Sequence, residues 1–69
     1  MIPDASDPRW RRLLTTDGEL EASTLATRLL VSRLRRELRA EPAALPGKIE
    51  ELRGYARSNP AAAAELARL

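Results

Sequence analysis

The residues with the clearest chemical potential are the arginines of "RLLVSRLRRELR", residues 28–39. This stretch contains five arginines and one acidic residue, Glu37, so it carries a charge of +4 in a chain whose net charge is +2. Guanidinium groups stay charged at physiological pH and present N–H donors in a planar fork that matches carboxylates and phosphates. The chemistry on offer is therefore recognition of an anion, on a nucleic acid, a lipid surface or an acidic protein.

The spacing of these residues predicts a polar stripe along one helix. Polar side chains recur every three or four positions, and residues at that spacing share one face of an α-helix. Four of the arginines have no acidic residue three or four positions away, and only Arg33 has such a partner, in Glu37. The predicted stripe comprises Glu21, Thr24, Arg28, Ser32, Arg35 and Arg39.

Three interpretations of the arginines remain open. Cations near the C-terminus of a helix are stabilised by its dipole, by about 0.3–1 kcal/mol each. Glu50 or Glu51 of a later helix could instead pair with them, within the fold or across a dimer. The third interpretation is contact with an anionic partner, for which the candidate residues are Arg28, Ser32, Arg35, Arg36, Arg39 and Trp10.

Catalytic and metal-dependent functions find little support in the residue types. The sequence has no cysteine and no histidine, which excludes disulfides, thiolate and imidazole metal ligands and the commonest general base. No hydroxyl side chain has a recognisable activating base, and no phosphate-binding loop is present. We expect neither an enzyme nor a cofactor, a metal or a small-molecule substrate.

Composition suggests where the protein works. No apolar run approaches the length that spans a bilayer, and the segment "MIPDASDPRW" lacks the pattern of a secretory signal. The "RWRRLL" stretch resembles an interfacial helix but is too short for stable attachment. We therefore expect a cytoplasmic protein without membrane attachment. Arginine greatly outnumbers lysine, which occurs only as Lys48, and together with abundant alanine and leucine this is typical of a GC-rich bacterial genome.

Proline and capping residues predict where the first two helices begin and end. Pro8 follows Ser6 and Asp7, which favours a short helix over residues 8–14. Thr16 followed by Glu19 matches a capping box and predicts the start of a long central helix over about 17–40. Pro42 should end that helix, because its ring disfavours helical geometry in the preceding residue.

The rest of the chain predicts two shorter helices. Pro46 suits the first turn of a helix that runs to about residue 57. Asn59 and Pro60 are a good N-cap and first residue for a last helix. No alternating strand pattern occurs. The sequence therefore predicts an all-α fold, a small bundle of three or four helices in a single domain over residues 8–69, preceded by a flexible N-terminus over residues 1–7.

The predicted core changes face midway along the long helix. Its first half places Ala22, Leu25, Ala26 and Leu29 on one side, and its second half places Leu30, Val31, Leu34 and Leu38 on another. We predict that Leu25, Leu29, Leu30, Leu34 and Leu38 are core residues. A stripe on the third helix, Leu45, Ile49, Leu52 and Ala56, should pack against the second half. Trp10 is predicted to be a core anchor whose indole N–H needs an acceptor.

A helical protein–protein interaction module is the leading expectation for function. Its partner would be another protein or a second copy of the chain in a homodimer, because a domain this short hides its leucines poorly. The alternative is a nucleic-acid-binding protein that uses the arginine stripe. Two glutamates near the start of the third helix argue against a helix-turn-helix, and two aromatic residues offer little base stacking. We do not expect nucleic acid to be the partner.

Overall fold

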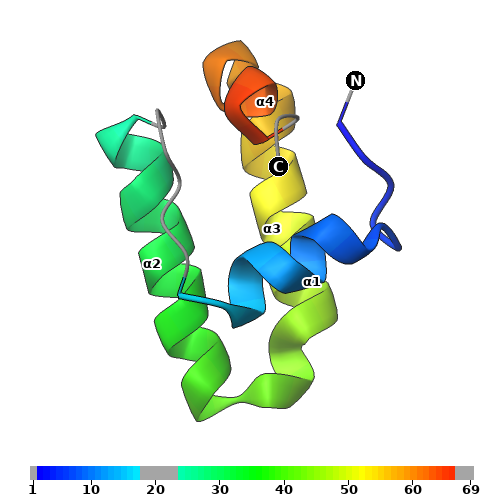
Figure 1. Ribbon diagram of the computed structural model, residues 1–69, viewed down its shortest axis with the longest axis vertical. Helices are drawn as coiled ribbons and strands as arrows, with labels where there is room; N and C mark the ends of the chain where they lie inside the picture. The colour runs from blue at the N-terminus through cyan, green and yellow to red at the C-terminus, as the bar shows by residue number, and fades with distance from the viewer. Residues whose placement is uncertain (1, 18–23, 67–69) are drawn as a thin grey trace.

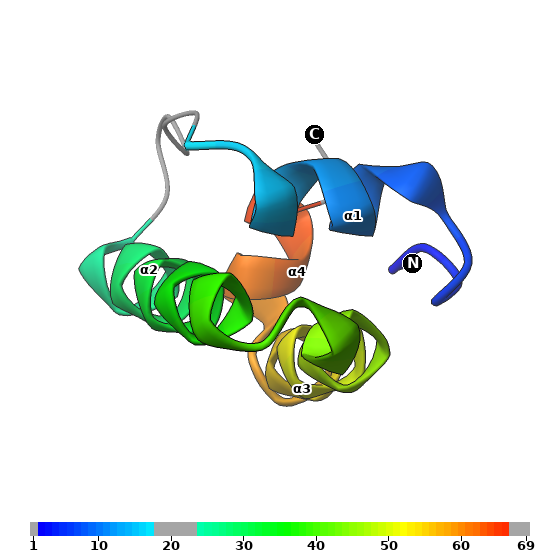
Figure 2. The same cartoon turned by 90° about the horizontal axis from the view of Figure 1, so that it is seen from below.

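The computed structural model describes residues 2–17 and 24–66 of the 69-residue chain. Within these ranges the chain is helical and contains no strand, which confirms the all-α class. Figure 1 shows α2 and α3 as an antiparallel pair joined at one end through η1, with α1 lying across them. Seen along the pair, α1 covers one side, and α4 packs against α3 (Figure 2). The elements are α1 (Pro8–Thr15), α2 (Leu25–Ala40), the 3₁₀ turn η1 (Pro42–Ala44), α3 (Leu45–Ser58) and α4 (Pro60–Leu66).

The long helix is present but begins later than the sequence predicts. Thr16 is the C-cap of α1, and both its backbone N–H and its hydroxyl donate to the Arg12 carbonyl oxygen, at 3.2 and 2.8 Å. Thr24 is the N-cap of α2, with its hydroxyl oxygen accepting from the Thr27 N–H at 3.3 Å. The predicted capping box at Thr16 is therefore wrong, and Glu19 lies outside the described residues. A threonine hydroxyl satisfies a carbonyl at a helix end as well as an amide at a helix start, so the local signal was ambiguous.

The other predicted helix boundaries are confirmed. Glu41 is the C-cap of α2, and its N–H donates to the Glu37 carbonyl oxygen at 3.0 Å. Asn59 precedes α4, and its side-chain oxygen accepts from the Ala62 N–H at 3.3 Å. Proline at the start of α3 and α4 needs no hydrogen bond there, because the first amides of a helix have no intrahelical acceptor.

The core lies where α1, α2 and α3 meet. Leu34 of α2 and Leu52 of α3 are fully buried, and Leu38 and Ile49 are buried beside them, as predicted. Leu30 is partly buried against the same cluster. The buried hydrophobic cluster consists of Trp10, Leu13, Leu14, Val31, Leu34, Leu38, Ile49, Leu52 and Ala56.

The predicted core residues of the first half of α2 are not buried. Leu25 and Leu29 are 63% and 61% exposed, and Ala26 is exposed as well. Among the described residues, the elements that contact α2 lie on the side of its buried residues, so the apolar residues on the opposite side have no described neighbour to pack against. Thr27 is the residue that faces inward at this level, with no exposed surface. Ala22 lies outside the described residues.

Thr27 is accommodated in the interior by a chain of polar contacts. Its hydroxyl lies 3.0 Å from the Thr24 hydroxyl and 3.5 Å from the Tyr55 hydroxyl of α3. The Tyr55 hydroxyl in turn accepts a hydrogen bond from the Asn59 side-chain amide at 3.3 Å. Because a buried hydroxyl without a partner is costly, these contacts favour the arrangement that joins the start of α2 to the end of α3.

The segment before α1, predicted to be a flexible N-terminus, packs on the helical domain. The Pro3 carbonyl oxygen accepts from the Trp10 indole N–H and from Arg53 Nε, each at 3.3 Å. Ile2 and Ala5 are partly buried against the core. The acceptor that the sequence predicts for the Trp10 indole N–H therefore lies in the segment that we predicted to be flexible. The packed residues extend back to Ile2.

The contrast between Leu34 and Leu29 predicts two different responses to truncation on one helix. Leu34→Ala should lower the free energy of unfolding by about 2–5 kcal/mol, because it removes buried methyl groups and leaves a cavity. Leu29→Ala should change it by less than about 0.5 kcal/mol, because its side chain is largely in water. Urea unfolding monitored by circular dichroism measures both, and equal losses would contradict the assignment of Leu29 to the surface.

The N-cap of α1 predicts a specific dependence of stability on pH. Asp7 accepts hydrogen bonds from the Arg9 guanidinium and from the Arg9 N–H, and these two interactions, in that order, lower its pKa from the ordinary 3.8. Because the folded-state pKa is the lower one, this stabilisation is present above about pH 4 and is lost as the pH falls through the folded value. Asp7→Asn keeps an oxygen acceptor but cannot titrate.

The stability of the wild type relative to Asp7→Asn should therefore stay constant well above the ordinary pKa of 3.8 and decline as the pH falls below it. Urea unfolding at a series of pH values measures this difference. Parallel stability curves for the two proteins over the whole range would show that the Asp7 carboxylate contributes nothing.

Candidate functional site

The side of α2 that faces away from the other helices is the candidate functional site. α2 stands at the edge of the bundle in both views (Figures 1 and 2), with its buried residues turned toward α1 and α3. The opposite side carries exposed residues at spacings of three and four, which place them on one face of the helix. We call this surface the outer face of α2; its residues are Leu25, Arg28, Leu29, Ser32, Arg36 and Arg39.

Two leucines form the apolar part of the outer face. Leu25 and Leu29 are one helical turn apart and therefore adjacent on the surface. Among the described residues they are the large hydrophobic side chains that the fold leaves exposed. A single exposed leucine is ordinary in a soluble protein, but a contiguous apolar area beside unpaired charges is a feature of interaction surfaces.

The arginines of the outer face are available for contact. Within residues 2–17 and 24–66, Arg28 and Arg36 make no hydrogen bond or ion pair through their side chains. Arg39 donates to the Asp17 carboxylate at 2.6 Å, and both side chains are largely exposed. An ion pair in such a position contributes about 0–1 kcal/mol, so another carboxylate can replace Asp17 at little cost.

Arg35, predicted to belong to the exposed stripe, has a structural role instead. Its Nε and Nη2 both donate to the Leu13 carbonyl oxygen, at 3.0 and 2.8 Å. That carbonyl is in the last turn of α1, where the helix supplies no amide partner. Partial burial lowers the pKa of Arg35, although the guanidinium remains charged. Position 35 borders the buried side of α2, and this was the one sign in the sequence that its side chain could turn inward.

The candidate residues Trp10 and Ser32 also differ in exposure, and only Ser32 is accessible to a partner. Trp10 is 2% exposed, so its core role is confirmed and its ring is not accessible to a partner. Ser32 is exposed in the middle of the outer face, where its small side chain leaves room for close approach. Of the six predicted site residues, the structure brings Arg28, Ser32, Arg36 and Arg39 together and separates Arg35 and Trp10 from them. Leu25 and Leu29 are candidate site residues that the sequence pattern assigns to the core, because leucine periodicity also predicts burial.

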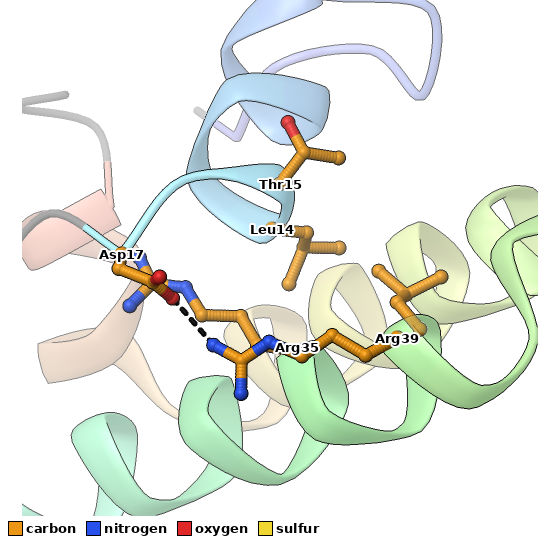
Figure 3. A pocket seen from close by; sticks show the side chains of 6 residues that line it. Leu14, Thr15, Asp17, Arg35 and Arg39 are labelled. Carbon is orange, nitrogen blue, oxygen red and sulfur yellow. Dashed lines mark hydrogen bonds and ion pairs between the residues drawn. The ribbon is translucent and has the colours of Figure 1, made fainter.

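A shallow depression adjoins one end of the outer face. It has a volume of about 220 Å³ and lies between the end of α1 and the last turns of α2. Figure 3 shows the Asp17 carboxylate reaching the Arg39 guanidinium across it, beside Arg35. The volume is below that of ordinary small-molecule pockets, so the depression suits one side chain of a partner better than a substrate. Its lining residues are Leu14, Thr15, Asp17, Arg35, Leu38 and Arg39.

Acidic side chains neutralise the cations on the α3 side of α2. Arg33 pairs with Glu37 at 3.2 Å, as the sequence predicts, and with Glu51 of α3 at 2.5 Å. Lys48 lies 3.0 Å from Glu37, and its hydrogen bond is the largest cause of the lowered pKa of that carboxyl group. Glu50 pairs with cations of its own helix, α3. Among the described residues, the positive charge of α2 is therefore balanced toward α3 and largely unbalanced on the outer face.

Comparison with protein-family models, with characterised proteins and with solved structures finds no match for this chain. Within the described ranges, acidic side chains do not gather in groups of three or more that could hold a metal ion. The helices in that part of the chain are also too short or too polar to cross a membrane.

The position of Arg35 predicts that it contributes to stability while its neighbour does not. Arg35→Gln should lower the free energy of unfolding by about 1–3 kcal/mol, because it removes two charge-assisted hydrogen bonds to a helix-end carbonyl. Arg36→Gln makes the same change in charge on the exposed side and should have little effect. Thermal unfolding of both variants in parallel measures the difference. If Arg35→Gln is as stable as the wild type, the contact with Leu13 does not hold α1 in place.

Proposed function

We propose that this protein is a small helical interaction module that binds another protein through the outer face of α2. The observation that carries the proposal is the juxtaposition of exposed Leu25 and Leu29 with Arg28 and Arg36, which have no partner among the described residues. Protein interfaces combine a small apolar centre with arginine more often than the rest of a protein surface does. On the composition of the sequence, we further propose that this binding takes place in the cytoplasm of a bacterium.

The energetics fit binding that is moderate in strength. Fully burying a leucine side chain contributes about 1.5–3 kcal/mol, and the two leucines are each more than half exposed at present. Arginines at the rim of an interface contribute mainly orientation and association rate. One helix face offers less area than a standard stable interface, which favours a reversible contact.

Nucleic acid receives less support as the partner than protein does. The predicted stripe would present Arg28, Arg35 and Arg39 to phosphates, but the Arg35 guanidinium is turned to the Leu13 carbonyl at the end of α1. Trp10 is buried and offers no stacking platform. Exposed leucines on the same face contribute nothing to phosphate contact, whereas they add to a protein interface.

The experiment is a comparison of three forms of the full chain as bait in native lysate, with and without nuclease treatment. The first is the wild type, the second carries Arg28→Gln and Arg36→Gln, and the third carries Arg11→Gln and Arg12→Gln. The third is a matched control, because Arg11 and Arg12 are also exposed and also lack an ion pair among the described residues, but they lie on α1. The two variants lose the same charge.

The wild type and the α1 control should retain the same proteins, and the α2 variant should lose them. Quantitative mass spectrometry of the bound fractions measures this. Identical fractions for all three baits would contradict a role for the outer face, and a bound fraction that disappears on nuclease treatment alone would favour nucleic acid as the partner.

A further inference from the structure

The shape of the outer face restricts which kind of secondary structure in a partner can bind to it. Leu25, Leu29, Ser32 and Arg36 recur at spacings of four, three and four, which makes a strip about 16 Å long and nearly parallel to the axis of α2. From Leu29 onward the backbone N–H groups beneath this strip bond within the helix, so an extended strand would find no continuous row of backbone partners there. A second α-helix, in contrast, packs side chains between those of such a strip, and the small Ser32 allows it to approach closely.

The side chains of the outer face change from apolar to cationic along α2. The apolar part, Leu25 and Leu29, is at the N-terminal end of α2, and the guanidinium groups of Arg36 and Arg39 are toward the C-terminal end, with Arg28 beside the leucines. The described part of the outer face carries no carboxylate. A complementary helix therefore has apolar residues at one end of its contact face and carboxylates at the other.

The direction of such a helix follows from electrostatics. Carboxylates are most favourable in the first turn of a helix, where they oppose its positive end. The acidic turn must lie over Arg36 and Arg39, so the partner helix begins near the C-terminus of α2 and runs antiparallel to it. Asp17 already shows the contact that a partner carboxylate would make, because it binds Arg39 from outside the helix at 2.6 Å.

A second copy of this chain is a poor occupant of the same surface. Two outer faces placed together would bring Arg28, Arg36 and Arg39 of each copy into one interface. The described part of each face supplies no carboxylate to compensate them, and like charges held close together in an interface are repulsive. Charge complementarity thus favours a different protein over self-association.

We infer that the partner of the outer face of α2 is an acidic amphipathic α-helix of another protein, bound antiparallel to α2. Its apolar side chains cover Leu25 and Leu29, and the carboxylates of its first turns pair with Arg36 and Arg39. The acid nearest Arg39 replaces Asp17 at the edge of the depression beside Leu14 and Leu38. This inference rests on the proposed function and gives it the chemistry of the partner.

The probe is a synthetic alanine-based helical peptide with glutamates in its first turns and two leucines four residues apart in its second half. The control peptide has the same composition, with the leucines moved to opposite sides of the helix. Nuclear magnetic resonance titration of the full chain should give saturable shifts centred on α2 with the probe and at least tenfold weaker binding with the control. The double change of Leu25 and Leu29 to serine should weaken probe binding at least tenfold, and so should the change of Arg28 and Arg36 to glutamine.

The Arg11→Gln and Arg12→Gln variant should bind the probe like the wild type. Equal binding of the two peptides, or no binding of either, would overturn the inference, and so would a probe that binds away from α2. Anionic phospholipid vesicles, mixed-sequence RNA and sedimentation of the chain alone are run beside the peptides. Tighter binding to vesicles or RNA through the same residues, or a dimer that the leucine change abolishes, would also overturn it.

The failure of this inference can be told from the failure of the proposed function. If the lysate comparison shows proteins that depend on Arg28 and Arg36 while the probe does not bind, the module stands and its partner is not an acidic helix. If neither the lysate proteins nor the probe depend on the outer face, both proposals fail together.

Discussion

The packing of α1 across the pair formed by α2 and α3 is the contact on which the rest of this structure depends. α1 is eight residues long, yet it contributes Trp10, Leu13 and Leu14 to the buried cluster. A helix of that length is not stable by itself, so the contact must be held by burial and by its end groups. The Pro3 carbonyl that binds the Trp10 indole and the Arg35 guanidinium that binds the Leu13 carbonyl fix α1 at its two ends. α1 and α3 both pack on the same side of α2, so among the described elements it is this side of α2 that is buried.

The arginines of α2 therefore have three different roles, which the residue type alone does not distinguish. Arg35 reaches inward and satisfies the end of α1, while Arg33 joins Glu37 and Glu51 and ties α2 to α3. Arg28 and Arg36 point away from every element that the structure describes and remain uncompensated. The charge that matters for recognition is therefore smaller than the charge of the helix, and it lies beside exposed leucines rather than in a purely cationic groove. This difference is what separates a surface suited to protein from one suited to phosphates.

The end of the bundle where α2 begins is held by polar rather than apolar contacts. Thr27 occupies the inward position at this level and bonds to Thr24 and Tyr55, and Asn59 completes the set. A buried hydroxyl group needs a hydrogen-bond partner, whereas a leucine packs against any apolar surface. The hydroxyl groups therefore specify more strictly which helix ends pack together. They also explain why Leu25 and Leu29 are turned outward, because the same helical turn cannot direct both sets of side chains toward α3. The exposed leucines are thus a consequence of how this end of the fold is closed.

The elements whose signals are local can be predicted from the sequence alone. Pro42 and the Asn59–Pro60 pair define helix ends through backbone geometry that does not depend on neighbours, and the helices end and begin there. The 3.6-residue periodicity of Val31, Leu34 and Leu38, matched by Ile49, Leu52 and Ala56, likewise identified the buried sides of α2 and α3. The packing of the helices, in contrast, sets which Thr begins α2, which leucines stay in water and which arginine turns inward. These choices depend on which side of α2 is covered. Periodicity gives the direction of a side chain around its own helix but contains no information about the neighbour that lies there.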